Sequence, residues 1–392
     1  MYNCRVAQRG ILLNADITGY TQFLHGSELE HARQVLKDLL NVLIEHTRSP
    51  LILVAVEGDS VDAYALDGAI QSPQTLIEMV ERTYLAFRQA LQLMLLNNQC
   101  QCNACRNIGT LDLKFFVHHG TFVREQFGEQ LQLVGHDVNL IHRLMKNSIT
   151  DTTGLRAYAA ITERAVEAFG LESLVTGMPR HSEQYDDVGE VGVVLHDLHG
   201  VWQQRKNEVR TFVTDEEAAS VISVEYPVPQ PVLWEYVTKP EYRTMLMGSD
   251  RQRLDRSGDS RTGTGSVFYC AHGSNVMVHT ILDWEPFEQY TTHETTPFPG
   301  LSVRGTYRLV PTEAGTRLDM LSGPAQGPWG MRQLMDLMGR LVFASTIRGH
   351  AERLREKIEA DLASGMLPVA AARVTPDRTS LNPPGAAAPQ AG

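Results

Sequence analysis

Apolar positions in the first half of the chain follow two periods in turn, which predicts strands separated by long helices. Short apolar runs of strand length occupy residues 11–15, 51–56, 61–65 and 111–118. Apolar residues at helical spacing occupy residues 21–45, 73–96 and 138–147. This βαββαβ order is typical of an α+β domain with a mostly antiparallel sheet.

The pattern changes near residue 215, where a charged segment at residues 211–219 is typical of a linker. Beyond it, the chain is rich in short strands separated by turns that contain Gly, Pro and Asp. These strand-like runs occupy residues 221–228, 265–271, 276–284, 288–296, 301–309 and 316–321. We expect a short helix at residues 231–242 and a long closing helix at about residues 330–363.

The end of the chain has a different composition. From residue 367 it is rich in Ala, Pro and Gly and shows no periodicity, which is typical of disorder. We therefore expect two domains, residues 1–214 and 215–365, and a disordered tail, residues 366–392.

Composition narrows the class of protein. Of the 392 residues, 43% are hydrophobic and 21% are charged, as is normal for a soluble globular protein. No apolar run approaches the roughly 18 residues of a membrane span, and the N-terminus lacks the apolar core of a signal peptide, so we expect a cytoplasmic protein. The net charge of −11, with no basic stripe, argues against nucleic acid as a partner. A polyphosphate ligand would need local positive charge or metal ions.

Two aspartates at the ends of strand-like runs are the first candidates for chemistry. Asp16 lies within residues 14–20, and Asp59 lies in the turn at residues 57–60. Brought together, two carboxylates can hold two Mg²⁺ ions against a triphosphate. Backbone amides after Asp16 would suit phosphate groups. Taken singly, each aspartate is also explained by an ordinary helix cap or turn.

Asn139 and Arg143 form the second candidate pair. They are four positions apart, so they share one face of the predicted helix. Asn can orient a ribose or ring oxygen, and Arg can stabilise the charge that develops on a transferred phosphoryl group. The alternative for this pair alone is an ordinary exposed helix surface.

Together these segments resemble the class III adenylate and guanylate cyclase homology domain, over roughly residues 8–200. The stretches occur in the family's order with similar spacing. They are residues 15–21 with Phe23, residues 58–60, residues 118–120, and Gly135 with Val138, Asn139 and Arg143. Residues 57–59, the cysteines near residue 100 and residues 137–144 are most similar to a divergent bacterial branch of uncharacterised cyclase-like proteins. The resemblance implies a ferredoxin-like fold.

The resemblance also implies roles for single residues. Asp16 and Asp59 match the two aspartates that bind Mg²⁺ or Mn²⁺, and the backbone carbonyl of Ile17 matches a third metal contact. Asn139 matches the ribose-orienting residue, and Arg143 matches the transition-state arginine. The further expected nucleotide contacts are Ile17, Thr18, Gly19, Tyr20 and Gln132. In the family, the ribose 3′-hydroxyl attacks the α-phosphate of ATP or GTP, and the site forms between two subunits, which implies a homodimer.

The base-selecting positions depart from the family pattern. Ala55 stands where adenylate cyclases usually have Lys and guanylate cyclases have Glu. Glu57 is two positions away, and the partner position is Gln132, whose amide can bind either purine. The choice between ATP and GTP therefore stays open. For a second phosphate-binding lysine, Lys146 and Lys206 are the candidates.

Three cysteines, Cys100, Cys102 and Cys105, lie in a polar segment between a predicted helix and a predicted strand. Three thiols at this spacing can bind a structural Zn²⁺ together with a fourth ligand from elsewhere in the chain. The conceivable fourth ligands are Cys4, His118 and His119. The alternative is a reduced loop without a metal.

Residues 224–363 resemble the START-like, helix-grip family that is often labelled polyketide cyclase or dehydrase. The matching features are residues 228–236, 239–241, 263–265, 283–286 and 315–317, and the long last helix. The resemblance implies a curved antiparallel sheet around that helix, often with an apolar cavity. Apolar helix residues at 331, 334, 337, 338, 341 and 342 would line such a cavity or simply fill the core. No acid–base pair stands out, which favours binding or sensing of an apolar small molecule.

Three functions therefore remain open. The first is an enzyme that makes cyclic AMP or cyclic GMP in intracellular signalling. The second is a catalytically degenerate module that binds ATP, and the third is a carrier of a hydrophobic ligand. Retention of Asp16, Asp59, Asn139 and Arg143 favours the first two.

Overall fold

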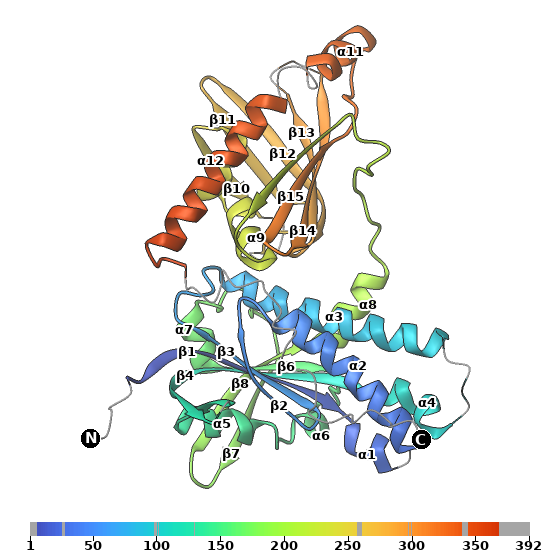
Figure 1. Cartoon of the computed structure of the whole chain (residues 1–392), viewed down its shortest axis with the longest axis vertical. Coiled ribbons are helices and arrows are strands. Elements are labelled where there is room, and N and C mark those ends of the chain that lie inside the picture. The colour runs from blue at the N-terminus through green and yellow to red at the C-terminus, as the bar shows by residue number, and fades with distance from the viewer. Residues whose placement is uncertain are drawn as a thin grey trace, which may run out of the picture.

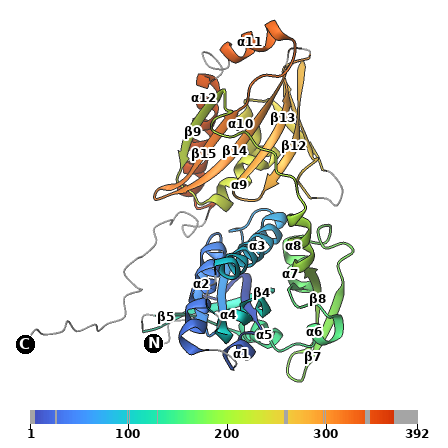
Figure 2. The same cartoon turned by 90° about the vertical axis from the view of Figure 1, so that its right-hand side faces the viewer.

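The computed structural model of the chain describes residues 6–25, 28–97, 100, 102–128, 130–256, 261–296, 298, 300–338 and 344–367. It forms two domains, which lie one above the other in Figures 1 and 2. No described helix combines the length and apolarity needed to cross a membrane.

The N-terminal domain contains an eight-stranded sheet with the order β2-β3-β1-β4-β6-β8-β7, and β5 pairs with β4. The strands are β1 (Gln8–Thr18), β2 (Ile52–Glu57), β3 (Ser60–Leu66), β4 (Asp112–Phe127), β5 (Gln130–Val134), β6 (Tyr158–Thr162), β7 (Arg180–Tyr185) and β8 (Gly189–Asp197). All pairs are antiparallel except β4 with β6. The predicted α+β class and mostly antiparallel sheet are confirmed.

Helices cover both faces of this sheet (Figure 1). They are α1 (Tyr20–His25), α2 (Leu29–Thr47), α3 (Pro73–Asn97), α4 (Asn103–Asn107), the 3₁₀ turn η1 (Ile108–Thr110), α5 (His136–Leu144), α6 (Ile149–Thr153), α7 (Glu163–Phe169) and α8 (Leu198–Lys206). Along β1, Ile11 and Leu13 belong to the core shared with α2 and α3, whereas Leu12 belongs to the core shared with α5. Because side chains alternate along a strand, Asp16 points to the same face as Leu12, which is the α5 face.

The C-terminal domain is one antiparallel sheet of seven strands in the order β10-β11-β12-β13-β14-β15-β9. The strands are β9 (Ser220–Tyr226), β10 (Arg251–Asp255), β11 (Val267–His272), β12 (Asn275–Glu285), β13 (Gln289–Thr295), β14 (Ser302–Thr312) and β15 (Gly315–Ser322), and the helices are α9 (Gln230–Thr238), α10 (Pro240–Met247), α11 (Trp329–Met338) and α12 (Ala344–Ala363). Leu354 and Ile358 of α12 are buried in the core with residues of β9 and β15. The long helix lies across the sheet in Figure 1, but the START-like family stays a prediction.

Two helix predictions in this domain are wrong in detail. The single helix expected at 231–242 is divided at Lys239 because the proline that follows begins a new helix, α10. The described part of residues 330–363 forms two helices, α11 and α12. Met331 is 40% exposed, so it does not line a cavity, and the side chains at 334–342 lie outside the described residues. The predicted disorder after residue 367 also lies outside the described part.

Helix α3 joins the two domains. Its first half contributes polar side chains to the C-terminal domain, and most of these contacts are partly buried. The pairs are Gln74 with Thr262 at 2.7 Å, Glu78 with Trp284 at 2.7 Å, Glu81 with Arg261 at 3.0 Å, and Arg82 with Glu288 at 2.9 Å. One helix of the N-terminal domain therefore makes several polar contacts with the C-terminal domain.

Candidate functional site

Asp16 and Asp59 lie close together because β1 and β3 are adjacent antiparallel strands. Asp16 is directly opposite Ser60, and the backbone N–H of Ile17 donates to the carbonyl oxygen of Asp59 over 3.1 Å. Gly58 has a positive φ of 63°, which allows the tight turn that brings Asp59 back toward β1. The pairing of the two strands thus places both carboxylates at one edge of the sheet.

The pocket makes both aspartates costly to ionise. Burial and the neighbouring charge of Asp59 raise the pKa of Asp16 to about 6, and Lys114 only partly opposes them. Burial also raises the pKa of Asp59. Within the described residues, neither carboxylate forms an ion pair with a cationic side chain. A half-buried pair of this kind favours binding of a cation, which would remove the repulsion.

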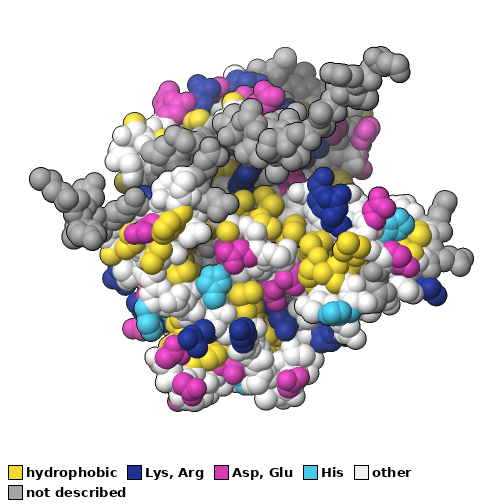
Figure 3. Space-filling model, turned by 60° about the horizontal axis from the view of Figure 1, so that its bottom comes forward, with side chains coloured by type: hydrophobic (Ala, Val, Ile, Leu, Met, Phe, Trp, Pro, Cys, Tyr) yellow, Lys and Arg dark blue, Asp and Glu magenta, His cyan; other side chains and the backbone are white. Residues whose placement is uncertain are grey.

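The aspartates line a pocket of about 1020 Å³ that also contains the other predicted nucleotide residues except Gln132. Lys114 stands opposite Asp16 on β4, so its side chain is on the same face of the sheet. The remaining members of the predicted set are in the same wall: Ile17, Thr18, Gly19, Tyr20, Asn139, Arg143 and Lys146. Figure 3 shows this lower face of the molecule, where acidic, basic and histidine side chains surround hydrophobic ones. All of these residues come from one chain.

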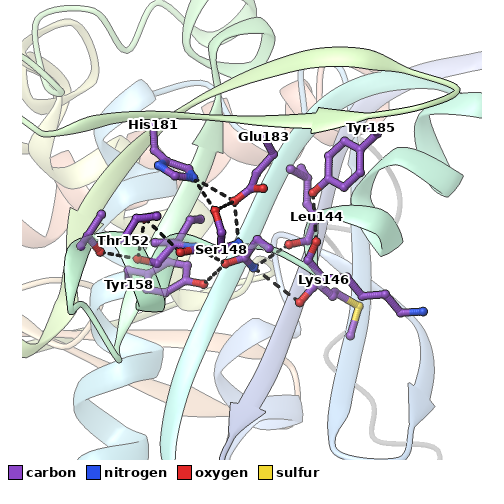
Figure 4. Close-up of polar contacts among 12 residues, drawn as sticks. Leu144, Lys146, Ser148, Thr152, Tyr158, His181, Glu183 and Tyr185 are labelled. Atoms are coloured by element: carbon purple, nitrogen blue, oxygen red, sulfur yellow. Dashed lines mark hydrogen bonds and ion pairs between the residues drawn. The ribbon is translucent and has the colours of Figure 1, made fainter.

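Helix α5, which carries Asn139 and Arg143, is held at both ends. At its start, Asp137 is buried, accepts the backbone N–H of Thr121 over 2.6 Å and lies 3.3 Å from His118 Nε2. Beyond its end, Ser148 donates from both its N–H and its hydroxyl to Glu183 on β7, at 2.7 and 2.9 Å (Figure 4). These anchors fix the helix so that its exposed face looks into the pocket.

The same close-up shows a second layer of anchors behind the helix end. His181 Nε2 lies 2.8 Å from Glu183, and the hydroxyl of Tyr185 donates to the carbonyl oxygen of Lys146 (Figure 4). Tyr158 donates to Asn147 over 2.9 Å. Strands β6 and β7 therefore support the segment that follows Arg143.

Arg143 itself forms an ion pair with Asp187 in the turn between β7 and β8, at 2.6 Å. Both side chains are about half exposed, at 48% and 53%. A pair this exposed contributes little free energy, so a phosphate group can compete for the guanidinium.

A second pocket of about 510 Å³ adjoins the first, because Glu57 and His142 line both. It contains the two positions predicted to select the base, Ala55 and Gln132. The pocket also contains Asp62, whose carboxylate accepts from Asn14 over 2.8 Å and whose pKa is raised by burial. The predicted base positions are thus brought together, with one additional acidic group.

The proteins that match by sequence carry names that state no activity. Residues 36–153 match a family described as "Protein of unknown function (DUF2652)". The curated "Uncharacterized protein Rv2561/Rv2562" of Mycobacterium tuberculosis is 25% identical over 114 residues, which cover 29% of this chain. The chain spans about half of the length of that relative, 52%.

Among solved structures, similar chains include nucleotidyl cyclases. The guanylyl cyclase Cya2 is 20% identical with a TM-score of 0.37, and the match covers 49% of this chain and 92% of that one. The adenylyl cyclase CyaB from P. aeruginosa is 14% identical with a TM-score of 0.37, covering 49% and 95%. Protein MLL2253 from Mesorhizobium loti is 18% identical with a TM-score of 0.27, covering 37% and 96%.

The structure also corrects several expectations about single residues. Lys206 lies over the ring of Trp202 on α8 and does not line the pocket, whereas Lys146 does. Lys114 was not predicted, because its only signal is its register opposite Asp16, which needs the sheet order.

His118 and His119 are wrong as zinc ligands. His118 is engaged by Thr162 and Asp137, and His119 by Asp67. Cys4 lies outside the described residues.

Proposed function

We propose that this chain binds ATP or GTP together with Mg²⁺ or Mn²⁺ and converts it to a cyclic nucleotide. One observation carries the proposal: Asp16 and Asp59, a carboxylate pair without a cationic partner in the described structure, share one pocket with Lys114 and Lys146. The carboxylates suit divalent cations, and the lysines suit the phosphates. The pocket, at about 1020 Å³, has room for a triphosphate.

The donor set fits a divalent metal ion. Two half-buried carboxylates whose pKa values are raised, Asp16 by burial and by the charge of Asp59 and Asp59 by burial, are the oxygen ligands that Mg²⁺ prefers, and the Ile17 carbonyl is an expected third contact. Bound there, the metal would neutralise phosphate charge and make the attacking oxygen more acidic. Asp16 and Asp59 would hold it, and Lys114 would add positive charge beside them.

The proposed reaction is an internal displacement at phosphorus. The ribose 3′-hydroxyl loses its proton to solvent in the open pocket and forms a bond to the α-phosphorus. The bond from that phosphorus to the bridging oxygen breaks, and pyrophosphate leaves. Asn139 would orient the ribose, and Arg143 would leave Asp187 to stabilise the charge on the phosphoryl group.

The adjoining pocket is the proposed base site. Gln132 can donate and accept, while Glu57 and Asp62 accept when ionised. An acidic group beside an amide suits the N–H groups of guanine, and a protonated Asp62 suits adenine as well. ATP and GTP are therefore both proposed substrates.

The deciding experiment is direct. Purified protein is incubated with ATP or GTP and with Mg²⁺ or Mn²⁺, and cyclic nucleotide and pyrophosphate are quantified. We expect product in equal amounts with pyrophosphate, dependent on the divalent ion and lost in Asp59→Asn. Asp255→Asn, an exposed carboxylate on β10, is the matched control and should retain full activity. Tight nucleotide binding without product would leave only the degenerate binding module, and no binding at all would favour the carrier.

A mixing experiment tests the proposed homodimer. If aspartates of one subunit act with Asn139 and Arg143 of the other, mixing inactive Asp59→Asn with inactive Arg143→Ala restores about a quarter of the activity, because half of the random dimers regain one of two sites. If the pocket of a single chain is complete, the mixture stays inactive. The aspartates and the pair Asn139 and Arg143 line one pocket of one chain, so the mixing experiment decides between a site shared by two subunits and a site complete in one.

For the C-terminal domain, binding or sensing of an apolar small molecule stays a proposal. Its described interior is rich in aromatic rings, and the ring of Tyr290 contacts those of both Trp234 and Tyr307. The same interior buries Arg243 completely, beside His279 at 3.1 Å. A ligand there would have to accommodate this cation as well as the rings.

A further inference from the structure

We propose that His31 completes a four-ligand zinc site with Cys100, Cys102 and Cys105. One nitrogen of His31 and the three sulfur atoms all lie within 4.8 Å of one another. His31 is in the first turn of α2, and the cysteines lie at and just before the start of α4, 71 positions away in the case of Cys102. The fold therefore gathers the four ligands from two distant segments.

The distances match those of a tetrahedral zinc centre. His31 Nδ1 lies 3.2 Å from Cys102 Sγ, 3.7 Å from Cys100 Sγ and 3.8 Å from Cys105 Sγ. With bonds of about 2.3 Å to sulfur and about 2.1 Å to nitrogen, a tetrahedral Zn²⁺ sets each N···S separation at about 3.6 Å. The imidazole nitrogen is thus at zinc-like distance from all three sulfurs at once, which hydrogen bonding to a single thiol would not produce.

The surroundings of the sulfurs favour thiolate ligands over a disulfide. None of the three cysteines is part of a disulfide bond. The backbone N–H of Cys102 points to Cys100 Sγ at 3.5 Å, and the N–H of Cys105 points to Cys102 Sγ at 3.4 Å. Backbone N–H donors of this kind stabilise the negative charge of metal-bound sulfur. Three sulfurs and one imidazole are a donor set that selects Zn²⁺ over Mg²⁺ or Ca²⁺.

The position of the site indicates a structural role. Four protein ligands leave no open coordination position for a substrate. Glu28, just before α2, reinforces the junction by accepting the N–H of Ala104 over 3.1 Å. The segment that follows the cysteines lies close to Gly19. The carbonyl oxygen of Thr110 is only 3.4 Å from where a Cβ atom at Gly19 would be. The zinc would therefore hold together α2, α4 and the wall behind the predicted nucleotide contacts.

The test uses the full chain and zinc itself. Zinc is quantified after purification without added metal, and Co²⁺ replaces it to report thiolate ligation by charge-transfer absorption. We expect about one Zn²⁺ per chain and tetrahedral cobalt bands. His31→Ala and Cys100→Ser should each bind zinc at least about 100-fold more weakly, and a chelator should lower the melting temperature of the wild type. His199→Ala, an exposed histidine on α8, is the matched control and should keep its zinc.

Some results would overturn the site. One is wild-type protein that contains no zinc and whose melting temperature responds neither to Zn²⁺ nor to a chelator. Another is His31→Ala that keeps wild-type zinc content and an unchanged cobalt spectrum, which would exclude His31 as the ligand. Because zinc content is read without any nucleotide, failure of this site is distinguishable from failure of the proposed cyclase reaction.

Discussion

Two pairs of acidic side chains in the N-terminal domain are treated by the fold in opposite ways. Glu78 on α3 is buried and Glu81 is largely buried between the domains, and both accept side-chain hydrogen bonds from each domain. Asp16 and Asp59 lie in an open pocket and have no cationic partner within the described structure. The difference teaches which carboxylates the protein uses for its own stability and which it leaves for a ligand.

Glu78 and Glu81 differ in pKa because their hydrogen-bond partners differ. Burial raises the pKa of Glu81, but Arg261 and His196 outweigh it and lower the pKa to about 2. Glu78 receives hydrogen bonds from the neutral donors Trp284 and Gln74, and burial raises its pKa to about 7. A cationic partner within hydrogen-bonding distance thus decides the charge state of each buried carboxylate.

The largest expected effect concerns the open pair. Asp16→Asn should lower the rate of cyclic nucleotide formation about 1000-fold, roughly 4 kcal/mol, because one metal ligand is lost. In the presence of a chelator the same change should leave the free energy of unfolding unchanged or raise it by up to about 1 kcal/mol, since it removes repulsion with Asp59. Activity and urea unfolding are measured on one preparation. A large loss of stability would show that Asp16 is a structural residue and would break the comparison.

The next effect concerns Glu81. Glu81→Gln should lower the free energy of unfolding by about 3 kcal/mol at pH 7, because it removes the negative charge that accepts two hydrogen bonds from Arg261 and one from His196 at the domain junction. Urea denaturation of the full chain gives the value. Glu190→Gln, on the exposed side of β8, serves as the control and should change stability by less than about 0.5 kcal/mol. An unchanged stability in Glu81→Gln would mean that the interdomain ion pair is dispensable.

The pH dependence of stability should follow Glu78. Its folded pKa of about 7 is above the unfolded value of 4.5, so the stabilising contribution is fully present below pH 4.5 and is lost as the pH rises through 7. The expected loss is on the order of 2 to 3 kcal/mol. Glu78→Gln keeps an acceptor for Trp284 and should flatten the stability profile between about pH 6 and 7.5, while Asp16, whose pKa is raised to about 6, still contributes a slope below that. Glu81 acts in the other direction and only below pH 4.5, since its folded pKa is lowered. A wild-type profile that is flat from pH 5 to 7.5 would contradict a raised pKa at Glu78.

The smallest effect concerns the exposed ion pair at the pocket. Asp187→Asn frees Arg143 from a partner worth no more than about 1 kcal/mol. We therefore expect the apparent affinity for nucleotide to increase by at most about five-fold, and the increase to shrink at high salt. Titration of binding at two salt concentrations measures it. A loss of affinity would mean that Asp187 contributes to the site directly.

Much of the fold follows from local pattern. Strands β1 to β3 and helix α3 were predicted within a few residues, because both faces of β1 are apolar and α3 has a long helical period; β4 was predicted only in its first half. The break at Pro240 was also present in the sequence, since proline restricts the residue before it. Strand β10 is short and mostly exposed, so it carries no apolar signal, and only its pairing with β11 defines it.

The candidate site also contains residues that a local motif predicts and residues that only the folded structure reveals. Asp16 and Asp59 carry a local motif and were predicted, whereas Lys114 and His31 act only through three-dimensional neighbours. His31 occupies an exposed position in a helix where histidine is unremarkable, and its distance from the cysteines depends on how α2 packs on α4. No spacing rule relates positions 71 residues apart, so the fourth ligand could not be predicted.

The segment between the domains sets how far they can separate. Arg210 binds Asp283 at 2.7 Å and Val213 is buried. These residues therefore pack with the C-terminal domain, although the sequence predicted them within residues 1–214. The free tether is therefore residues 207–209, which are exposed and at full extension reach about 10 Å. So short a tether keeps the two surfaces at a high effective concentration. Weakening the contacts of α3 would then let the two domain surfaces open more often, but the short connection would make them close again quickly.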